Sequence, residues 1–160
     1  MREIEQLLAV ANHYLAQASE IVDANVGLGL MTIGEATRRH RPQSLSSGEL
    51  ALAHLGSAAV RLATLCEIGG YRRTENYRQK FYDRSGHRKS GWSASKIRAA
   101  MASEPQEHLH LLLRDNVAHQ EPGNANTKDI ASDRSAMLKK TTLATCDRAL
   151  RAIARKLKSR

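Results

Sequence analysis

The chain has 160 residues, of which 41% are hydrophobic, and it carries a formal net charge of +9 with a pI near 10.0. This length and apolar content predict one globular domain over residues 1–160. The N-terminus, MREIEQLL, carries charges where a secretory signal needs an apolar run, so we expect no such signal, and no segment suggests a membrane span. We therefore expect a cytoplasmic protein without a membrane partner, in which Cys66 and Cys146 are reduced and buried.

The excess of positive charge indicates a polyanionic partner, and nucleic acid fits it better than an acidic membrane surface. The alternative is that the charge serves only solubility. Charge by itself does not define the fold.

Helical periodicity begins at the N-terminus. Apolar residues spaced three and four apart predict a helix of about six turns over residues 4–25. Thr32 and Glu35 have the spacing of a capping box, which predicts a short helix that Pro42 closes. Ser46 or Ser47 is expected to cap a second long helix ending at the glycine pair 69–70. Its apolar series is Leu52, Leu55, Ala59, Leu62 and Cys66.

Residues 71–92 differ from the rest of the chain. Seven of these 22 residues are Lys or Arg, and five of the six aromatic residues of the chain lie here. We expect a long, partly ordered connection in which rings stack on RNA bases and cations contact phosphates. The predicted RNA-binding residues are Arg72, Arg73, Tyr77, Arg78 and Lys80. The alternative is that the rings fill the core, as we expect for Trp92, while the charges are solvated.

Three further helices are expected after residue 92. Ser95 should begin a short helix through Met101, and Ser103 should cap a stronger helix with Pro105 in its first turn. A polar loop over 124–129 leads to a final helix whose last turn is rich in Lys and Arg. The apolar residues of the last two helices are Leu109, Leu112, Leu113, Val117, and then Leu143, Cys146, Leu150, Ile153 and Leu157. With no strand-like alternation, the pattern predicts an all-α bundle of four to five main helices.

The candidate catalytic residues lie in the stretch RDNVAH, from Arg114 to His119. Cleaving RNA without a metal requires a base for the 2′-hydroxyl, an acid for the leaving 5′-oxygen and a cation for the phosphate. Histidine moves protons near neutral pH, and arginine presents a fork of donors that matches phosphate. Asp115 and Asn116 can orient either group. We expect Arg114 and His119 at a polar helix end, where replacing them leaves the fold intact.

An arginine, a polar residue and then a histidine, late in a small all-α domain, resemble the Rx4-6H motif of the HEPN superfamily (higher eukaryote and prokaryote nucleotide-binding). The resemblance implies a HEPN-like bundle and a metal-independent endoribonuclease of toxin–antitoxin or antiviral defence type. It assigns catalysis to Arg114 and His119, with Asp115 as the polar helper, and it implies a homodimer with paired motifs. An antitoxin or other regulatory protein is the implied partner. Glu121 stands where some members have a tyrosine that accepts a nucleotide, so that form of control is not expected.

Two other functions fit the same helices. One is a non-catalytic RNA-binding or dimerisation module, and the other is a structural subunit whose charge serves an acidic protein partner. No cofactor is indicated. No metal site is expected, because His108 and His110, beside Glu107, are two positions apart on a helix and face away from each other.

Overall fold

The computed structural model describes residues 2–37, 46–68, 77–103, 113–115 and 129–158. These residues form helices without any strand, so the chain is all-α, as the sequence predicts. Five of the helices have ten residues or more: α1 (Arg2–Ala24), α4 (Ser47–Ile68), α6 (Ala94–Ser103), α8 (Asp129–Leu138) and α9 (Leu143–Lys158). Three are shorter: α2 (Val26–Gly29), α3 (Ile33–Thr37) and α5 (Tyr77–Phe81).

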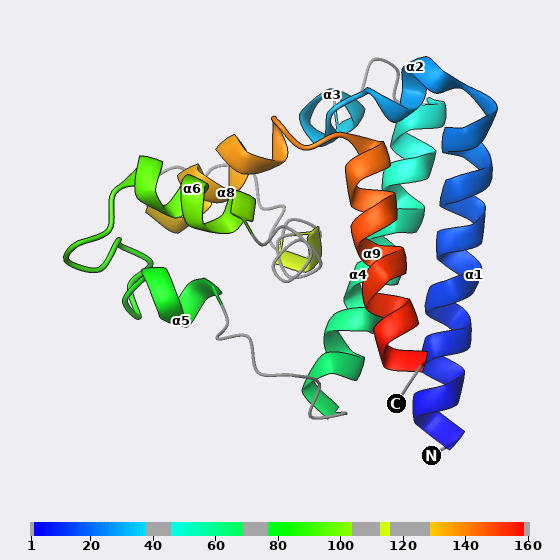
Figure 1. Ribbon diagram of the computed structural model, residues 1–160, viewed down its shortest axis with the longest axis horizontal. Coiled ribbons are helices and arrows are strands. Elements are labelled where there is room, and N and C mark those ends of the chain that lie inside the picture. The colour runs from blue at the N-terminus through cyan, green and yellow to red at the C-terminus, as the bar shows by residue number, and fades with distance from the viewer. Residues whose placement is uncertain (1, 38–45, 69–76, 104–112, 116–128, 159–160) are drawn as a thin grey trace.

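The three longest helices form a bundle. α4 and α9 pack against α1 and against each other, and both run in the direction opposite to α1 (Figure 1). The residues between them are mostly alanine and leucine, and small side chains allow helices to approach closely. The fully or nearly fully buried ones include Ala11, Leu15, Ala18, Leu55, Ala58, Ala59, Leu62, Ala149 and Leu150. The three-and-four spacing therefore identified the core faces of all three helices.

Two capping boxes begin helices where the sequence predicts them. The backbone N–H of Glu35 donates to the Thr32 hydroxyl over 3.1 Å, and the Thr32 hydroxyl donates to the Glu35 carboxylate over 3.0 Å. Ser46 and Glu49 repeat this arrangement at α4. Such reciprocal bonds satisfy N–H groups that have no partner in the first turn of a helix.

The start of α9 is fixed by a contact with the loop before α3. The N–H of Ile33 donates to the carbonyl of Thr141 over 2.9 Å, and the N–H of Leu143 donates to that of Met31 over 2.8 Å. These two bonds join segments more than a hundred positions apart, and they close one end of the bundle.

A second group of helices, α5, α6 and α8, lies beside the bundle (Figure 1). α8 contacts both α3 and α6. α8 is a helix that the sequence patterns did not identify. It buries Asp133 and Leu138, with Ile130 and Met137 packed partly buried against the core, so a charged residue interrupts its apolar side. α6 agrees with the expected short helix, although Ser93 rather than Ser95 caps it, accepting from the N–H of Lys96 over 3.2 Å.

The described part of the basic aromatic segment, residues 77–92, comprises α5 and the turn that follows it. Tyr77, Phe81 and Tyr82 are buried, and the ring of Trp92 meets that of Phe81 edge to face at 4.6 Å. Trp92 packs against the core, as expected. Burying large aromatic rings stabilises the fold, because it removes much apolar surface from water.

Both cysteines are free thiols, as predicted, but only Cys146 is fully buried while Cys66 is half-buried. Burial raises the pKa of the Cys146 thiol. Among the described helices, α4 alone is long and apolar enough to span a membrane, which corrects the expectation that no segment is. Its buried face against α1 and α9 is what the core helix of a bundle requires.

Candidate functional site

Two of the six residues of the RDNVAH motif, Arg114 and Asp115, are described, and with Leu113 they form a helical turn. The turn lies between the α5–α6–α8 group and α4 (Figure 1). Leu113 is fully buried and anchors it in the core. Asn116 and His119 lie outside the described residues, as do Arg72 and Arg73.

Asp115 is a buried carboxylate surrounded by donors. Its side chain is only 2% exposed, and the hydroxyl of Tyr77 donates to its Oδ2 atom. The guanidinium of Arg78 lies on the same side, with 3.6 Å between Nε and Oδ2. A buried charge is tolerated only when it is paired and hydrogen-bonded, and these neighbours meet that condition.

Arg114 covers the other oxygen of this carboxylate. Its Nε donates to Oδ1 of Asp115 over 3.1 Å, and its Nη2 lies 3.1 Å from the same atom. Its Nη1 donates over 3.1 Å to Oε1 of Glu67, near the end of α4. The Arg114 side chain is 18% exposed whereas that of Glu67 is 68% exposed. One edge of the guanidinium is therefore held by a buried carboxylate, and the other by an exposed one.

This environment corrects one expectation. Arg114 is not a solvent-facing residue at a polar helix end, because its charge helps to neutralise buried Asp115. Replacing it will therefore disturb the packing of Tyr77 and Asp115 as well as any function of the motif. Asp115 does contact Arg114 in the way that an orienting residue must.

Tyr77 was predicted to stack on RNA, and that prediction is wrong. Its ring is 1% exposed, so no base can reach it. Burial raises the pKa of Tyr77, and the negative charge of Asp115 raises that pKa further. The phenol therefore stays protonated and acts as a donor to Asp115.

The two cations of the same segment have different surroundings. The side chain of Arg78 is 40% exposed and lies beside Asp115, whereas the Lys80 ammonium is 5.5 Å from the centre of the Phe81 ring. The fold thus brings Tyr77 and Arg78 to Arg114 and Asp115, although the two pairs are far apart in the sequence. No short-range motif signals this encounter.

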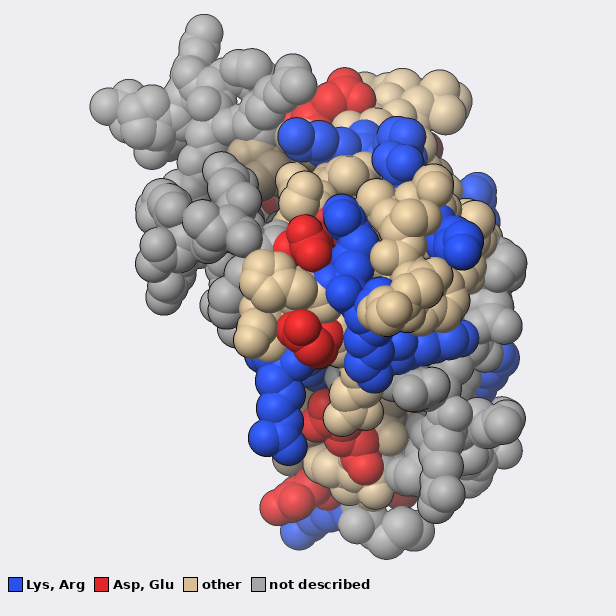
Figure 2. All heavy atoms as spheres, turned by 90° about the vertical axis from the view of Figure 1, so that its left-hand side faces the viewer, with Lys and Arg blue, Asp and Glu red and all other residues tan. Residues whose placement is uncertain are grey.

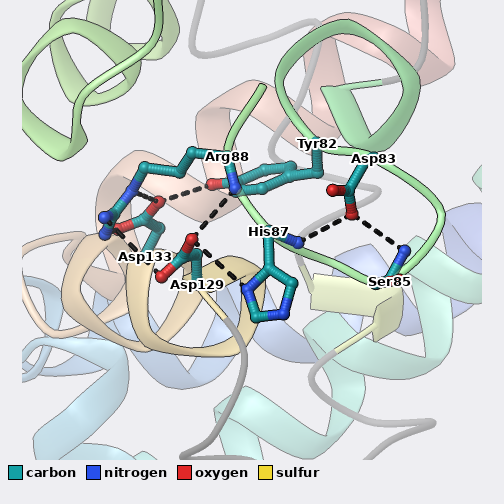
Figure 3. A network of polar contacts seen from close by, with 7 residues as sticks. All are labelled: Tyr82, Asp83, Ser85, His87, Arg88, Asp129 and Asp133. Atoms are coloured by element: carbon teal, nitrogen blue, oxygen red, sulfur yellow. Dashed lines mark hydrogen bonds and ion pairs between the residues drawn. The ribbon is translucent and has the colours of Figure 1, made fainter. Parts of the chain in front are cut away.

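A second polar network links the turn after α5 to α8 (Figure 3). Arg88 donates to Asp133 through Nε over 2.9 Å and through Nη2 over 2.7 Å, and the Tyr82 hydroxyl donates to Oδ2 of Asp133 over 2.8 Å. Burial raises the pKa of Tyr82, as does its bond to Asp133. The bidentate pair holds α8 against the turn.

His87 gains a partner from the same helix. Its Nδ1 atom lies 3.7 Å from Oδ2 of Asp129, the first residue of α8 (Figure 3). Asp129 is far from His87 along the chain, so no local sequence pattern signals this pair. The backbone N–H of Ser85 donates to Asp83, as does that of His87, so Asp83 shapes the turn. A bond from the Arg88 N–H is the main reason that the pKa of Asp129 is lowered.

Basic side chains gather on the face formed by this group of helices. Figure 2 shows Lys and Arg forming a band across the face, with Asp and Glu side chains among them. The exposed cations of this group include Arg84, Lys89, Lys96 and Arg98. Within the described ranges, no group of three His, Cys, Asp or Glu residues is placed to hold a metal ion.

No protein-family model matches the chain, and neither a curated protein nor a solved structure is significantly similar to it. The fold and the surroundings of Arg114 therefore define the class as an all-α protein with an arginine held by a buried carboxylate.

Proposed function

We propose that the protein is a metal-independent endoribonuclease of HEPN type, with Arg114 binding the scissile phosphate and His119 transferring the proton. The observation that carries this proposal is the way Arg114 is held. Buried Asp115 fixes one edge of the guanidinium, and only exposed Glu67 pairs with the other. An arginine oriented in advance by a carboxylate loses little freedom when it binds phosphate.

Glu67 can be displaced at small cost. An ion pair with an exposed carboxylate contributes about 0–1 kcal/mol, whereas a charge-assisted bond from arginine contributes about 1.5–3 kcal/mol. A phosphate oxygen can therefore replace Oε1 of Glu67 at Nη1 of Arg114 while Asp115 stays in place. Arg78, 40% exposed and beside the same carboxylate, supplies a second cation on this side.

The proposed reaction is an internal transfer. A histidine takes the proton of the 2′-hydroxyl, the 2′-oxygen attacks phosphorus, and the bond from phosphorus to the 5′-oxygen breaks. A second histidine gives that 5′-oxygen a proton, which leaves a 2′,3′-cyclic phosphate and a 5′-hydroxyl. Because each motif has one histidine, a two-fold dimer would supply both the acid and the base. Under this proposal the protein acts in the cytoplasm, and a regulatory protein such as an antitoxin controls it.

A non-catalytic RNA-binding module is the second candidate. It is favoured by the fact that Arg114 already pairs with two carboxylates, which is also the geometry of a purely structural ion pair. In that case the cations bind RNA and no bond is broken. A structural subunit with an acidic protein partner would bind no RNA at all.

Cleavage of labelled RNA in the presence of a chelator tests the proposal. We expect the wild type to cut and His119→Ala to bind RNA but cut at least about 10²-fold more slowly. Arg114→Ala should lose both binding and cleavage, whereas Glu67→Gln should keep both because it removes only the competing carboxylate. Full cleavage by His119→Ala would refute the catalytic assignment, and binding without cleavage by the wild type would favour the module. A strict monomer in light scattering at high concentration would exclude the shared site.

A further inference from the structure

Helix α9 carries a line of cations that the RDNVAH motif does not use. Arg148, Arg151, Arg155 and Lys158 follow one another at spacings of three, four and three. At about 100° per residue these four side chains fall within an arc of about 80° and extend over about 15 Å of helix axis. We call these four residues the α9 stripe.

The stripe lies outside the buried side of α9, and one edge of it borders that side at Asp147. The buried residues of the helix, among them Leu143, Cys146, Leu150 and Ile153, point into the bundle. Arg148, Arg155 and Lys158 are exposed, and Arg151 is half-buried. The only acidic residue of α9 is Asp147, which is itself buried.

Asp147 accounts for one cation of the four. It accepts from Nη2 of Arg151 over 2.6 Å and from the hydroxyl of Ser19 on α1 over 2.9 Å. In the part of the chain that the structure describes, Arg148, Arg155 and Lys158 have no carboxylate within ion-pair distance. Among the described residues these three cations thus have no acidic partner, and all three are exposed.

The helix dipole explains only part of this arrangement. Cations in the last turn, such as Arg155 and Lys158, interact favourably with the carboxyl end of a helix. The effect falls off within one turn, so it gives no reason for Arg148, which lies in the first half of α9. Like charges on neighbouring turns also repel each other, so the row lowers the stability of the isolated protein.

We propose that the α9 stripe binds the phosphate backbone of a single-stranded RNA, separately from the site at Arg114. A row of unpaired cations matches a row of phosphates, and such contacts position a strand without reading its sequence. A membrane surface fits less well, because an interfacial helix inserts its apolar side and that side of α9 is buried in the bundle. This inference rests on RNA being the ligand in the proposed function, and it adds a second contact surface.

The test is the salt dependence of binding to a short, labelled 2′-O-methyl RNA, which cannot be cut by 2′-hydroxyl attack. The triple variant Arg148→Gln, Arg155→Gln and Lys158→Gln removes the unpaired cations and keeps Arg151 to neutralise Asp147. Each phosphate contact contributes about 0.7 to the slope on a single strand, so the slope should fall by about 2. Between salt concentrations fourfold apart, the wild type should then lose about twentyfold more affinity than the variant.

A charge-matched control separates the stripe from net charge. Arg2, Lys139 and Lys140 are exposed cations outside α9, and their replacement by Gln removes the same charge. We expect this control to retain nearly the wild-type slope, and circular dichroism melts to show both triple variants folded. An equal fall in the two triple variants, or an unchanged slope in the α9 variant, would overturn the proposal. So would binding to vesicles of anionic lipid that depends on the stripe while RNA binding does not.

Failure of the stripe and failure of the proposed function give different results. If the α9 variant loses salt-dependent binding and the wild type does not cleave ordinary RNA, the stripe is supported and the ribonuclease proposal is refuted. Cleavage by the wild type with no change of slope in the α9 variant refutes the stripe alone.

Discussion

Replacing Arg114 by alanine should destabilise the protein, because it removes the principal neutralising partner of a buried carboxylate. The lost bond to Asp115 is charge-assisted and contributes about 1.5–3 kcal/mol. The lost pair with Glu67 adds at most about 1 kcal/mol, since that side chain is 68% exposed. The larger penalty of about 3–5 kcal/mol for an unpaired buried charge is not expected, because Tyr77 and Arg78 remain beside Asp115. The free energy of unfolding should therefore fall by about 2–4 kcal/mol.

Urea unfolding followed by circular dichroism at neutral pH measures this loss. With a slope of about 2 kcal/mol per molar urea, the midpoint for Arg114→Ala should fall by about 1–2 M. The matched control Glu67→Gln breaks only the exposed pair and should shift the midpoint by less than about 0.5 M. A midpoint for Arg114→Ala equal to that of the wild type would refute the reasoning, because Asp115 would then not depend on Arg114. Cleavage by this variant must accordingly be measured where circular dichroism shows it folded.

Three other perturbations test separate parts of the structure. The raised pKa of Tyr82 makes the folded state keep its proton above pH 10, where the unfolded state loses it, so stability is complete below that pH and declines above it. Tyr82→Phe should flatten the decline by about 1.4 kcal/mol per pH unit in urea unfolding between pH 10 and 11.5, and an identical decline would contradict this assignment. Leu62→Ala, in the fully buried face of α4, should cost about 2–5 kcal/mol, while exposed Ala53→Ser should cost far less; equal melting temperatures would contradict the packing. Gly91→Ala should cost about 1–2 kcal/mol in the same melts, since Gly91 has a φ of +89° and open space around it, and a neutral result would exclude that backbone conformation.

The sequence by itself determined the all-α class and the three long helices. Their apolar residues recur at three-and-four spacing, which only a helix gathers onto one face, so α1, α4 and α9 could be predicted with their buried sides. The capping box of Thr32 and Glu35 was equally readable, because both partners lie within one turn, whereas Ser46 was predicted only as one of two possible caps. Local order of this kind depends on residues that are close together in the chain.

Only the tertiary structure decided what surrounds the candidate site. Tyr77 meets Asp115 across 38 positions and Arg88 meets Asp133 across 45, and no periodicity encodes such pairs. Helix α8 was missed for the same reason, since one of the two residues that it buries is a charged one, Asp133. From the sequence alone, an aspartate such as Asp133 is expected at the surface. It can be buried because Arg88 neutralises its charge and Tyr82 donates a hydrogen bond to it, and these partners become neighbours only when the chain has folded.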